Sequence, residues 1–515
     1  AGQLARGLRH VRHRSWPGGQ IEPLGCAARV PGRRKARAER LVEEEDGFPI
    51  LLGVPGEANT GGIYLFAAFI LKSPMSYAAA IDQLNAMVPE LYAAAGQARR
   101  KFSLDEVRTL LDALGNPQTS FRSVLIAGTN GKGSTASTLA SILTVAGHRT
   151  GLYTSPHLER PNERVRVDRE EIADADFARF FFLVSDKGEE LVREGKLPQL
   201  PSYFETLTAV AFLYFVELKV EIAVLEVGMG GRLDATNIVE PLLSVITDIS
   251  LDHMEWLGPT ISAITREKAG ILRRGGTMIT LPQHPEANQT LGEVATELGV
   301  RGVSAAAYVP AAVEKGPYSV EVMAETIEVR SPLAGAHQQR NVALAIAAAV
   351  ELEERYGIRM TPGAIEEGIR QTRWPGRLER LTSAGMEWVL DVAHNPAGAW
   401  ALRAGLRNIL RDHDPRTLIF SCLRDKPVTE MAQILFPLFE QVIVTPIHTA
   451  RAASVDDLLA AAKTTGTPAV AADSVREALR LAQERSTGGV AVVSGSVYLV
   501  GEARALLMAE KGGSK

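Results

Sequence analysis

The sequence predicts an α/β fold in two successive parts, a central domain built on a mostly parallel sheet and a smaller α/β domain after it. Three observations predict this arrangement. Short apolar runs of strand length alternate with longer runs of helical periodicity. A Gly-rich segment at residues 128–134 joins one such strand to the next helix. The alternation begins again after the segment Trp-Pro-Gly-Arg at residues 374–377.

The amino-acid composition limits which classes of protein and which partners are to be expected. The chain has 515 residues, of which 46% are hydrophobic, and this is ample for the cores of two or three domains. The formal net charge of −4 gives no reason to expect nucleic acid or an anionic membrane as a partner. With two cysteines, Cys26 and Cys422, no disulfide framework is expected, and a reducing cytoplasm fits best. A monomer is the default expectation.

The N-terminal part differs from the rest of the chain. Residues 1–40 carry ten Lys and Arg side chains against Glu22 and Glu39. We expect residues 1–74 to be a disordered or spurious extension, with a nucleic-acid arm or a transit peptide as alternatives. The apolar run at 63–71 is nine residues long, too short to span a bilayer. The central domain is then expected at residues 75–372 and the C-terminal domain at residues 373–515.

Periodicity assigns the strands and helices. A helical region at residues 77–114 precedes a buried strand at 123–127, the Gly-rich loop, a helix at 134–146 and a strand at 150–153, which together form a βαβ unit. Further helices are expected at 204–217, 261–269 and 341–356, further strands at 222–227 and 242–248, and short strands and turns at 276–330. The C-terminal block is expected to contain strands at 388–392, 417–421, 442–445 and 490–494 and helices at 397–409 and 428–438.

The Gly-rich loop predicts a phosphate site. Glycines let successive backbone N–H groups turn toward one anion, the following helix N-terminus adds partial positive charge, and Lys132 neutralises phosphate oxygens. Ser134 offers a hydroxyl to Mg²⁺. The loop is not a strict Walker A motif, because Ile126 replaces its first glycine and Gly133 separates Lys132 from Ser134. A Gly-rich turn with a solvated lysine is the alternative.

Three candidate metal ligands follow or end predicted strands, namely Ser155, Glu226 and His253. In open α/β sheets, ligands bind beyond the carboxyl ends of the strands. A carboxylate in an apolar strand is costly unless it is paired or binds a cation. These residues therefore predict a Mg²⁺ site. The alternative is that Glu226 pairs with Arg232 and that His253 caps a helix.

Two further features carry less information by themselves. Residues 228–237 form a second Gly-rich turn directly after Glu226. Lys268, judged from its neighbours alone, is an ordinary helix-end lysine beside Gly270.

Taken in order, these segments resemble the folylpolyglutamate synthase/dihydrofolate synthase family of Mur-type ligases. The matching pieces are AGTNGKGS at 127–134, TSPHLERPNERVRV at 154–167, SYFE at 202–205, LEVGMGGRLDATN at 225–237, Asp252-His253, REKAGI at 266–271, Asn341, WPGR at 374–377 and DVAHNP at 391–396. The match covers roughly residues 75–515. It implies a P-loop, Mur-ligase-like central domain followed by a smaller Rossmann-like domain.

The resemblance also implies roles for single residues. The nucleotide would be held by Thr129, Asn130, Gly131, Lys132, Gly133, Ser134, Asn341, Arg377 and Asp391. Mg²⁺ would be bound by Ser155, Glu226 and His253, with Ser134, and the catalytic groups would be Lys132, Lys268 and His253. Lys268 corresponds to the family lysine that is carbamylated, which would turn a cation into a carboxylate-like metal ligand.

For the other substrates, the resemblance implies two more groups of residues. The loop at 154–167 is similar to the family's mobile omega loop beside the folate pocket. The stretches that line a dihydropteroate site are matched by Ser202, Tyr203, Phe204, Glu205, Leu233, Asp234 and Ala235. His394 and Ser494 are candidates for the glutamate site. Met229 stands where the family often has Leu or Ile, which is a conservative departure.

The expected enzyme is therefore an ATP-dependent ligase that joins L-glutamate to dihydropteroate, to folates already bearing glutamate, or to both, through an acyl phosphate. Retention of the dihydropteroate-like segments favours both. One alternative is another Mur-type ligase acting on cell-wall precursors, against which the SYFE and LDAT segments argue. The other is a P-loop kinase, which would not need the DVAHNP segment or a second α/β block.

Overall fold

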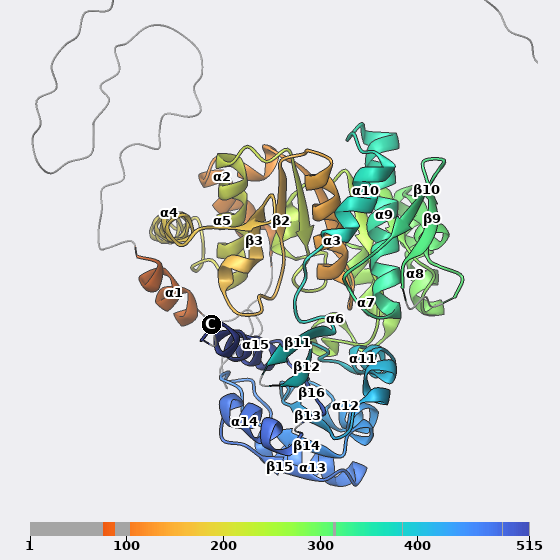
Figure 1. The fold of residues 1–515 in the computed structure, drawn as a ribbon. Coiled ribbons are helices and arrows are strands. Elements are labelled where there is room, and N and C mark those ends of the chain that lie inside the picture. Colours follow the sequence, from red (N-terminus) through yellow and green to blue (C-terminus); the bar gives the residue numbers. More distant parts are fainter. Residues whose placement is uncertain (1–75, 88–102, 313–315, 384, 487, 514–515) are drawn as a thin grey trace, which may run out of the picture. The chain divides into compact units, whose positions relative to one another are not determined.

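The computed structural model describes residues 76–87, 103–312, 316–383, 385–486 and 488–513. The predictions made for residues 1–74 lie outside this range. Within it, the expected α/β architecture is confirmed, with two separate sheets that are each flanked by helices (Figure 1). None of the helices in the described part of the chain has the length and apolar character that crossing a membrane requires.

The first sheet has eight strands in the order β4-β3-β2-β5-β1-β6-β7-β8. Its strands are β1 (Arg122–Ala127), β2 (Thr150–Tyr153), β3 (Val165–Val167), β4 (Glu170–Glu171), β5 (Ile222–Glu226), β6 (Leu243–Ile246), β7 (Thr277–Thr280) and β8 (Arg301–Ser304). Pairing is parallel from β2 through to β8, while β3 and β4 add an antiparallel edge. The central strand β1 lies between β5 and β6, so the loops after these three strands meet at one edge of the sheet.

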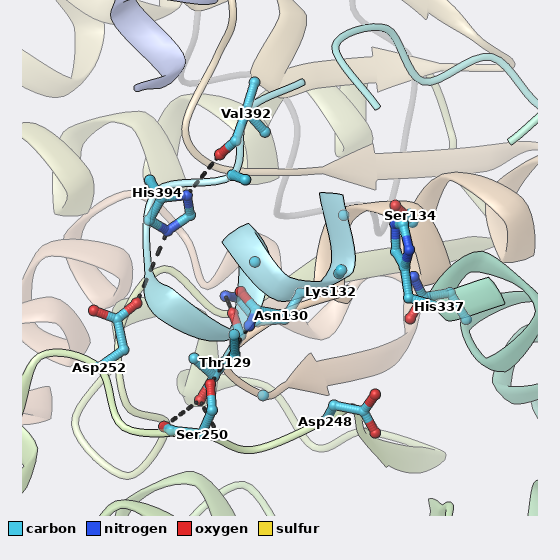
Figure 2. A pocket seen from close by; sticks show the side chains of 18 of the residues that line it. Thr129, Asn130, Lys132, Ser134, Asp248, Ser250, Asp252, His337, Val392 and His394 are labelled. Carbon is cyan, nitrogen blue, oxygen red and sulfur yellow. Dashed lines mark hydrogen bonds and ion pairs between the residues drawn. The ribbon is translucent and has the colours of Figure 1, made fainter. Parts of the chain in front are cut away.

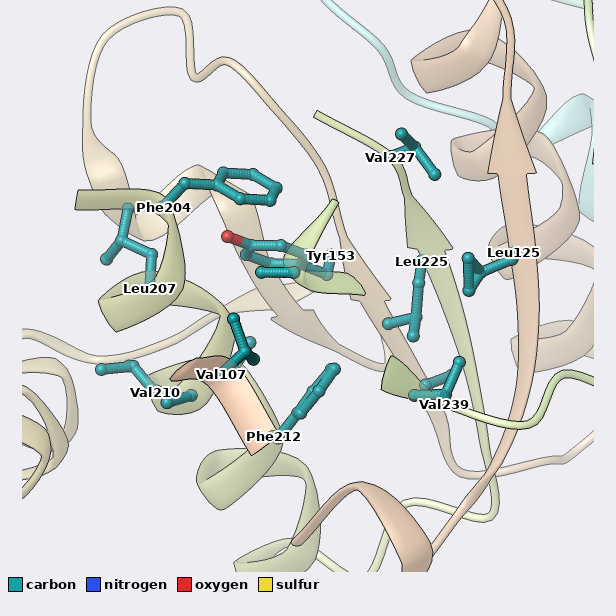
Figure 3. Packing of buried hydrophobic residues seen from close by; sticks show 14 of the residues in the cluster. Val107, Leu125, Tyr153, Phe204, Leu207, Val210, Phe212, Leu225, Val227 and Val239 are labelled. Carbon is teal, nitrogen blue, oxygen red and sulfur yellow. The ribbon is translucent and has the colours of Figure 1, made fainter. Parts of the chain in front are cut away.

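Helices cover both faces of this sheet. Consecutive residues of β1 point to opposite sides. Val124 and Ile126 pack with α3 (Lys132–Val145), α9 (Ala336–Tyr356) and α10 (Pro362–Arg370). Leu125 and Ala127 pack on the other face, where Figure 3 shows Tyr153, Phe204 and Phe212 in the same cluster. Burial on both faces explains why the strand reads as a continuous apolar run. Helices contributing to this second face are α1 (Tyr77–Ala86), α2 (Leu104–Ala113), α4 (Asp174–Arg193), α5 (Tyr203–Glu217), α7 (Ile261–Ala269) and α8 (Pro285–Leu298).

The second sheet has six strands in the order β11-β12-β16-β13-β14-β15, and only its edge strand β11 is antiparallel. Its strands are β11 (Glu379–Ser383), β12 (Met386–Asp391), β13 (Arg416–Phe420), β14 (Gln441–Val444), β15 (Ala469–Ala471) and β16 (Val490–Ser494). One face packs on α11 (Pro396–Ile409), α12 (Val428–Leu435) and α13 (Val455–Thr465), and the other on α14 (Val475–Arg485) and α15 (Val497–Gly513).

The elements that have not yet been named are short. They are β9 (Tyr318–Val322) and β10 (Glu325–Val329), which form a hairpin, the helix α6 (Met254–Leu257) and several 3-10 turns. In the region 276–330, where short strands and turns were expected, the structure also has the 14-residue helix α8. Its buried Ala287, Thr290, Leu291 and Val294 recur at helical spacing. The expected helical region 77–114 contains α1 and α2, with residues 88–102 outside the described range.

Candidate active site

A cavity of about 340 Å³ lies at the carboxyl edge of the first sheet and is also lined by the loop between β12 and α11 of the second (Figure 2). Fourteen predicted residues line it: Thr129, Asn130, Gly131, Lys132, Gly133, Ser134, Ser155, Glu226, His253, Lys268, Asn341, Arg377, Asp391 and His394. Parts of the chain that are distant in sequence thus converge on one space. All the residues predicted for the nucleotide and the metal are among them.

The glycines of the phosphate loop are explained by packing as well as by backbone conformation. A Cβ atom on Gly128 would overlap Thr247, and one on Gly131 would overlap the amide of Asn341. Gly131 also has φ of 89°, a conformation that favours glycine. A Cβ on Gly133 would press on the indole of Trp374. Each glycine therefore allows a different segment to approach the loop: the residue after β6, helix α9, and the linker before the second sheet.

Backbone hydrogen bonds tie the loop to the segment after β6. The amides of Thr129 and Asn130 donate to the carbonyl oxygen of Asp248 at 2.9 and 3.2 Å. The Thr129 hydroxyl lies 3.1 Å from the carbonyl oxygen of Ser250 and accepts from its amide at 3.1 Å. The Asp248 carboxylate in turn receives two hydrogen bonds from Arg340 at 2.6 and 3.0 Å. These bonds fix the loop to a segment that also lines the cavity.

The start of α3 supplies positive charge. Gly131 occupies the N-cap position and has no side chain with which to cap the helix. The first-turn residues Lys132, Gly133 and Ser134 line the cavity. Uncapped amides at a helix N-terminus attract anions, and the Lys132 ammonium adds a full charge beside them. The arrangement is suited to the phosphates of a nucleotide.

Glu226 is a buried carboxylate at the end of β5. Its Oε2 accepts a hydrogen bond from the Ser155 amide at 3.1 Å. Burial raises the pKa of Glu226, and the positive charge of Lys132 opposes this rise. The alternative that Glu226 pairs with Arg232 is wrong, because Arg232 pairs with Glu267 at 2.8 Å. A buried acid with so little compensation is the kind of group that a cation stabilises.

His253 stands at the N-cap position of α6 with φ of 50°. Its side chain makes no capping hydrogen bond to that helix. The alternative that His253 caps a helix therefore agrees with the position of its backbone, but it gives no role to the imidazole ring. Burial lowers the pKa of His253 to about 4, although the neighbouring Asp252 carboxylate opposes this. The ring is therefore neutral at pH 7, the form that binds metals. His253 lines the same cavity as Glu226, Ser134 and Ser155, so these side chains are available as ligands to Mg²⁺, which takes few protein ligands besides waters and phosphate oxygens.

Lys268 is buried, so the interpretation as an ordinary helix-end lysine is wrong. It lies on the last turn of α7, and its Nζ donates to the carbonyl oxygen of Gly128 at 2.7 Å. Burial, helped by the positive charge of Lys132, lowers the pKa of Lys268 to about 7. A large fraction of this amine is unprotonated at neutral pH, and an unprotonated amine is a nucleophile.

The second sheet contributes Asp391 and His394. Asp391 is buried, and its two carboxylate oxygens accept from the amides of Leu378 and Ala393, each at 2.9 Å. Burial raises the pKa of Asp391, while His337 and Arg377 oppose the rise. His394 directs Nδ1 to the Val392 carbonyl oxygen at 2.9 Å and Nε2 toward Asp252 at 3.8 Å (Figure 2).

Sequence reasoning missed a buried polar network centred on Asp252. Lys426 donates to Asp252 Oδ1 at 2.6 Å, and Asn395 donates to Oδ2 at 3.0 Å. Although burial opposes ionisation, His253 and His394 in their protonated forms and the Lys426 ammonium lower the pKa of Asp252 well below its ordinary value. Asp252 and Asn395 lie inside the motifs that carried the resemblance, and only this membership could have pointed to them. No motif or local pattern marked Lys426.

None of the residues predicted for dihydropteroate lines this cavity itself. Ser202 and Glu205 form the capping box of α5, Tyr203 lies against the Arg164 guanidinium, and Phe204 packs on Tyr153. Asp234 caps the short turn that contains Ala235 and accepts from the Met229 amide at 3.0 Å, while Leu233 is partly exposed. Phe204 and Asp234 both contact the position where a Gly228 side chain would be, and Gly228 lines the cavity. Their role in binding stays a prediction.

Ser494, predicted for glutamate, is buried at the end of β16, in register with Asp391 of β12. It does not line the cavity, whereas His394 does. Its assignment also stays a prediction.

Comparison with known proteins agrees with this geometry. Residues 126–349 match the Mur ligase middle domain, and residues 376–497 match the Mur ligase glutamate ligase domain. Folylpolyglutamate synthase of Lacticaseibacillus casei is 35% identical over 79% of this chain and 94% of that protein. Dihydrofolate synthase/folylpolyglutamate synthase of Mycobacterium tuberculosis is 34% identical over 78% of this chain and 90% of that protein.

A solved structure of E. coli FolC in complex with DHPP and ADP is also similar. Its TM-score is 0.73 and its sequence identity 29%, covering 85% of this chain and 98% of that one. The chain thus belongs to the folylpolyglutamate synthase/dihydrofolate synthase family of Mur ligases and is an ATP-dependent acid–amino-acid ligase.

Proposed function

We propose that this protein forms an amide bond between L-glutamate and both dihydropteroate and folates that already carry glutamate, by way of an acyl phosphate. One observation carries the proposal. The phosphate loop, the buried Glu226, His253 and Lys268, and residues of the second sheet all line a single cavity.

The chemistry requires an activated acid, because a carboxylate is a poor acyl donor at neutral pH. The acceptor carboxylate attacks the γ-phosphorus of ATP, the bond to the β-phosphate oxygen breaks, and ADP leaves. The glutamate amine then attacks the acyl carbon and displaces inorganic phosphate, releasing a proton. In such transfers the protein contributes mostly positioning and charge neutralisation. We assign the second task to Lys132 and the uncapped first turn of α3.

We assign nucleotide contacts from the other side of the cavity to Asn341, Arg377 and Asp391. Asn341 already touches the phosphate loop at Gly131, and Arg377 and Asp391 belong to the second domain. A site made from both domains must be assembled around its nucleotide, which favours closure before phosphoryl transfer.

Mg²⁺ would be held by Glu226 and His253 with the hydroxyls of Ser134 and Ser155, where it would neutralise charge on the phosphate oxygens. We further propose that Lys268 is carbamylated. The lowered pKa of Lys268, near 7, supplies the unprotonated amine that reacts with CO₂, and its position beside Gly128 places the product at the phosphate loop.

Both acceptors are proposed because Phe204 and Asp234, from the two predicted segments, lie at the position of a Gly228 side chain, and Gly228 lines the cavity. The similar FolC structure was solved with DHPP and ADP, which supports a pterin-type acceptor here. We place the enzyme in the cytoplasm and expect a monomer.

The test is ADP release by the purified chain with Mg·ATP, comparing reactions with and without L-glutamate and with each acceptor in turn. Mass spectra of the products should show one added glutamate on dihydropteroate and on a folate monoglutamate. ADP release that does not depend on glutamate would refute the ligase assignment, and turnover of one acceptor alone would refute bifunctionality.

A further inference from the structure

Asn395 is a buried polar side chain at the junction of the two sheets, and it makes four hydrogen bonds. It is 1% exposed. Its Oδ1 accepts from the Gly398 amide at 2.8 Å and from Asn130 Nδ2 at 3.3 Å. Its Nδ2 donates to Asn130 Oδ1 at 3.0 Å and to Asp252 Oδ2 at 3.0 Å. Both of its amide hydrogens and its oxygen are therefore used.

These partners come from three parts of the fold. Asn130 belongs to the phosphate loop, Asp252 follows β6 of the first sheet, and Asn395 ends the loop from β12 to α11 of the second. The pair of side-chain amides, Asn130 and Asn395, exchange two hydrogen bonds across 265 residues of sequence. This is a direct link between the second domain and the loop that holds phosphate.

Asp252 reinforces the link. Besides Asn395, it accepts from Lys426 at 2.6 Å, and both side chains of this ion pair are almost completely buried, with exposures of 5% and 8%. A buried network whose members are all satisfied specifies one arrangement of its elements, because any shift leaves a charge or an amide without a partner. Movement of the second domain would break the contacts of Asn130 and Asp252 together.

Capping of α11 does not account for this arrangement. Asn395 is the N-cap of α11, and that role uses one of its four hydrogen bonds, the one from Gly398. Serine or aspartate would serve equally well as a cap. The two donated hydrogen bonds need an amide.

We propose that Asn395 is a positioning residue for phosphoryl transfer, which holds Asn130, and through it the phosphate loop, in its reactive conformation when the second domain is seated against the first. The proposal rests on the ligase function above. With Asn395 in this role, the geometry around the γ-phosphate depends on domain closure. Phosphoryl transfer from ATP then occurs in the closed enzyme and not in the open one.

The experiment separates positioning from capping with three full-length variants. Asn395→Asp keeps both acceptor roles and loses both donor roles, Asn395→Ser keeps the cap alone, and Asn395→Ala loses everything. Thr361→Ala removes the N-cap of α10, which accepts from the Ala364 amide at 3.1 Å, and is the matched control for loss of a cap. Each variant is assayed for Tm and for glutamate-dependent ADP release with dihydropteroate, with kcat and the KM for ATP determined separately.

We expect Asn395→Asp and Asn395→Ser to lose about 10²-fold in kcat, the usual cost of misplacing reacting groups by about 1 Å. Their KM for ATP should change much less. Asn395→Ser should lose no more than about 3 °C in Tm, because the cap is kept. Asn395→Asp should lose more Tm, because its carboxylate would lie beside the buried carboxylate of Asp252. Thr361→Ala should lose Tm and keep kcat. The double variant Asn130→Ala with Asn395→Ser should lose little more kcat than the more damaging of the two single variants, because the two side chains act as a pair.

Two results would overturn the proposal. One is full kcat in both Asn395→Asp and Asn395→Ser, whatever their Tm, which would reduce Asn395 to a helix cap. The other is a double variant, Asn130→Ala with Asn395→Ser, whose fold-loss of kcat equals the product of the two single fold-losses. Failure of the wild-type enzyme to release ADP in the same assay would instead refute the ligase function.

Discussion

The Nζ atom of Lys268 lies 2.7 Å from the carbonyl oxygen of Gly128, so a side chain from α7 reaches the first residue of the phosphate loop. We expect Lys268→Ala to lose at least about 10²-fold in ligation, because it removes a charged group at a site where such groups each contribute that much. If Lys268 is carbamylated, short carboxylic acids should restore part of the activity. Carbon-13 NMR with labelled bicarbonate should show a carbamate signal in the wild type that Lys268→Ala lacks.

Arg266→Ala is the control on the same helix. Its guanidinium is exposed and pairs with Glu293 at 3.2 Å, so its loss should leave ligation unchanged. A Lys268→Ala enzyme with wild-type turnover would contradict the role of Lys268.

Lys132 faces the phosphates in the proposed complex. We expect Lys132→Ala to abolish glutamate-dependent ADP release, since the variant loses the positive charge at the start of α3. The measurement is single-turnover phosphate release at saturating Mg·ATP. Lys196→Ala is the comparison, because Lys196 is exposed and pairs with Glu194. Retained turnover in Lys132→Ala would remove the phosphate loop from the mechanism.

Gly501 on α15 lies so close to Leu158 that a Cβ atom would overlap the Leu158 carbonyl oxygen. Next to this contact Arg504 pairs with Glu159 at 2.6 Å. We expect Gly501→Ala to displace the loop at 154–167, lowering stability by about 1–3 kcal/mol through overpacking and raising the KM for the folate acceptor. Thermal unfolding and steady-state kinetics are the measurements.

Gly292→Ala is the matched substitution. Gly292 is inside α8 with no atom within 4 Å of its missing Cβ. Alanine should therefore raise stability by about 0.5–1 kcal/mol through helix propensity. If Gly501→Ala were as stable as Gly292→Ala, the close contact with Leu158 would not constrain the loop.

Lys426→Met should be strongly destabilising. It leaves the Asp252 carboxylate buried without its closest cation, and breaking a buried pair on one side costs about 3–5 kcal/mol. The double variant Asp252→Asn with Lys426→Met should recover much of this loss, because no unpaired charge remains. The midpoints of urea unfolding test the comparison, and equal midpoints for the single and double variants would count against it.

Cys422 should resist alkylation in the folded protein. Burial raises the pKa of its thiol to about 12, so at pH 8 it is protonated and sheltered, and the thiolate is the reactive form. Iodoacetamide at pH 8 should label Cys422 only after denaturation, as peptide mass spectra would show. Rapid labelling of the native protein at this position would contradict the burial of the thiol.

The nucleotide side of the cavity was accessible to sequence reasoning because its signals are local. A strand, a glycine loop and a helix start are contiguous, and Glu226 stands out as an acid in an apolar strand. The helix α8 was missed because its polar exposed face obscured its buried face. The residues 202–205 were recognised by resemblance alone, and locally they form a capping box, so their sequence pattern has a structural explanation without any ligand.

By itself the sequence determined the two α/β blocks, the phosphate loop and the family, because strand and helix periods and glycine turns are properties of neighbouring residues. Tertiary structure alone decided that Lys268 is buried, with its pKa lowered to about 7, and not an exposed helix-end lysine. The tertiary structure alone brought Asn130, Asp252 and Asn395 within hydrogen-bond distance of one another. The physical reason is that burial and hydrogen-bond partners depend on which distant segments the fold brings together, and no local pattern encodes a contact across 265 residues.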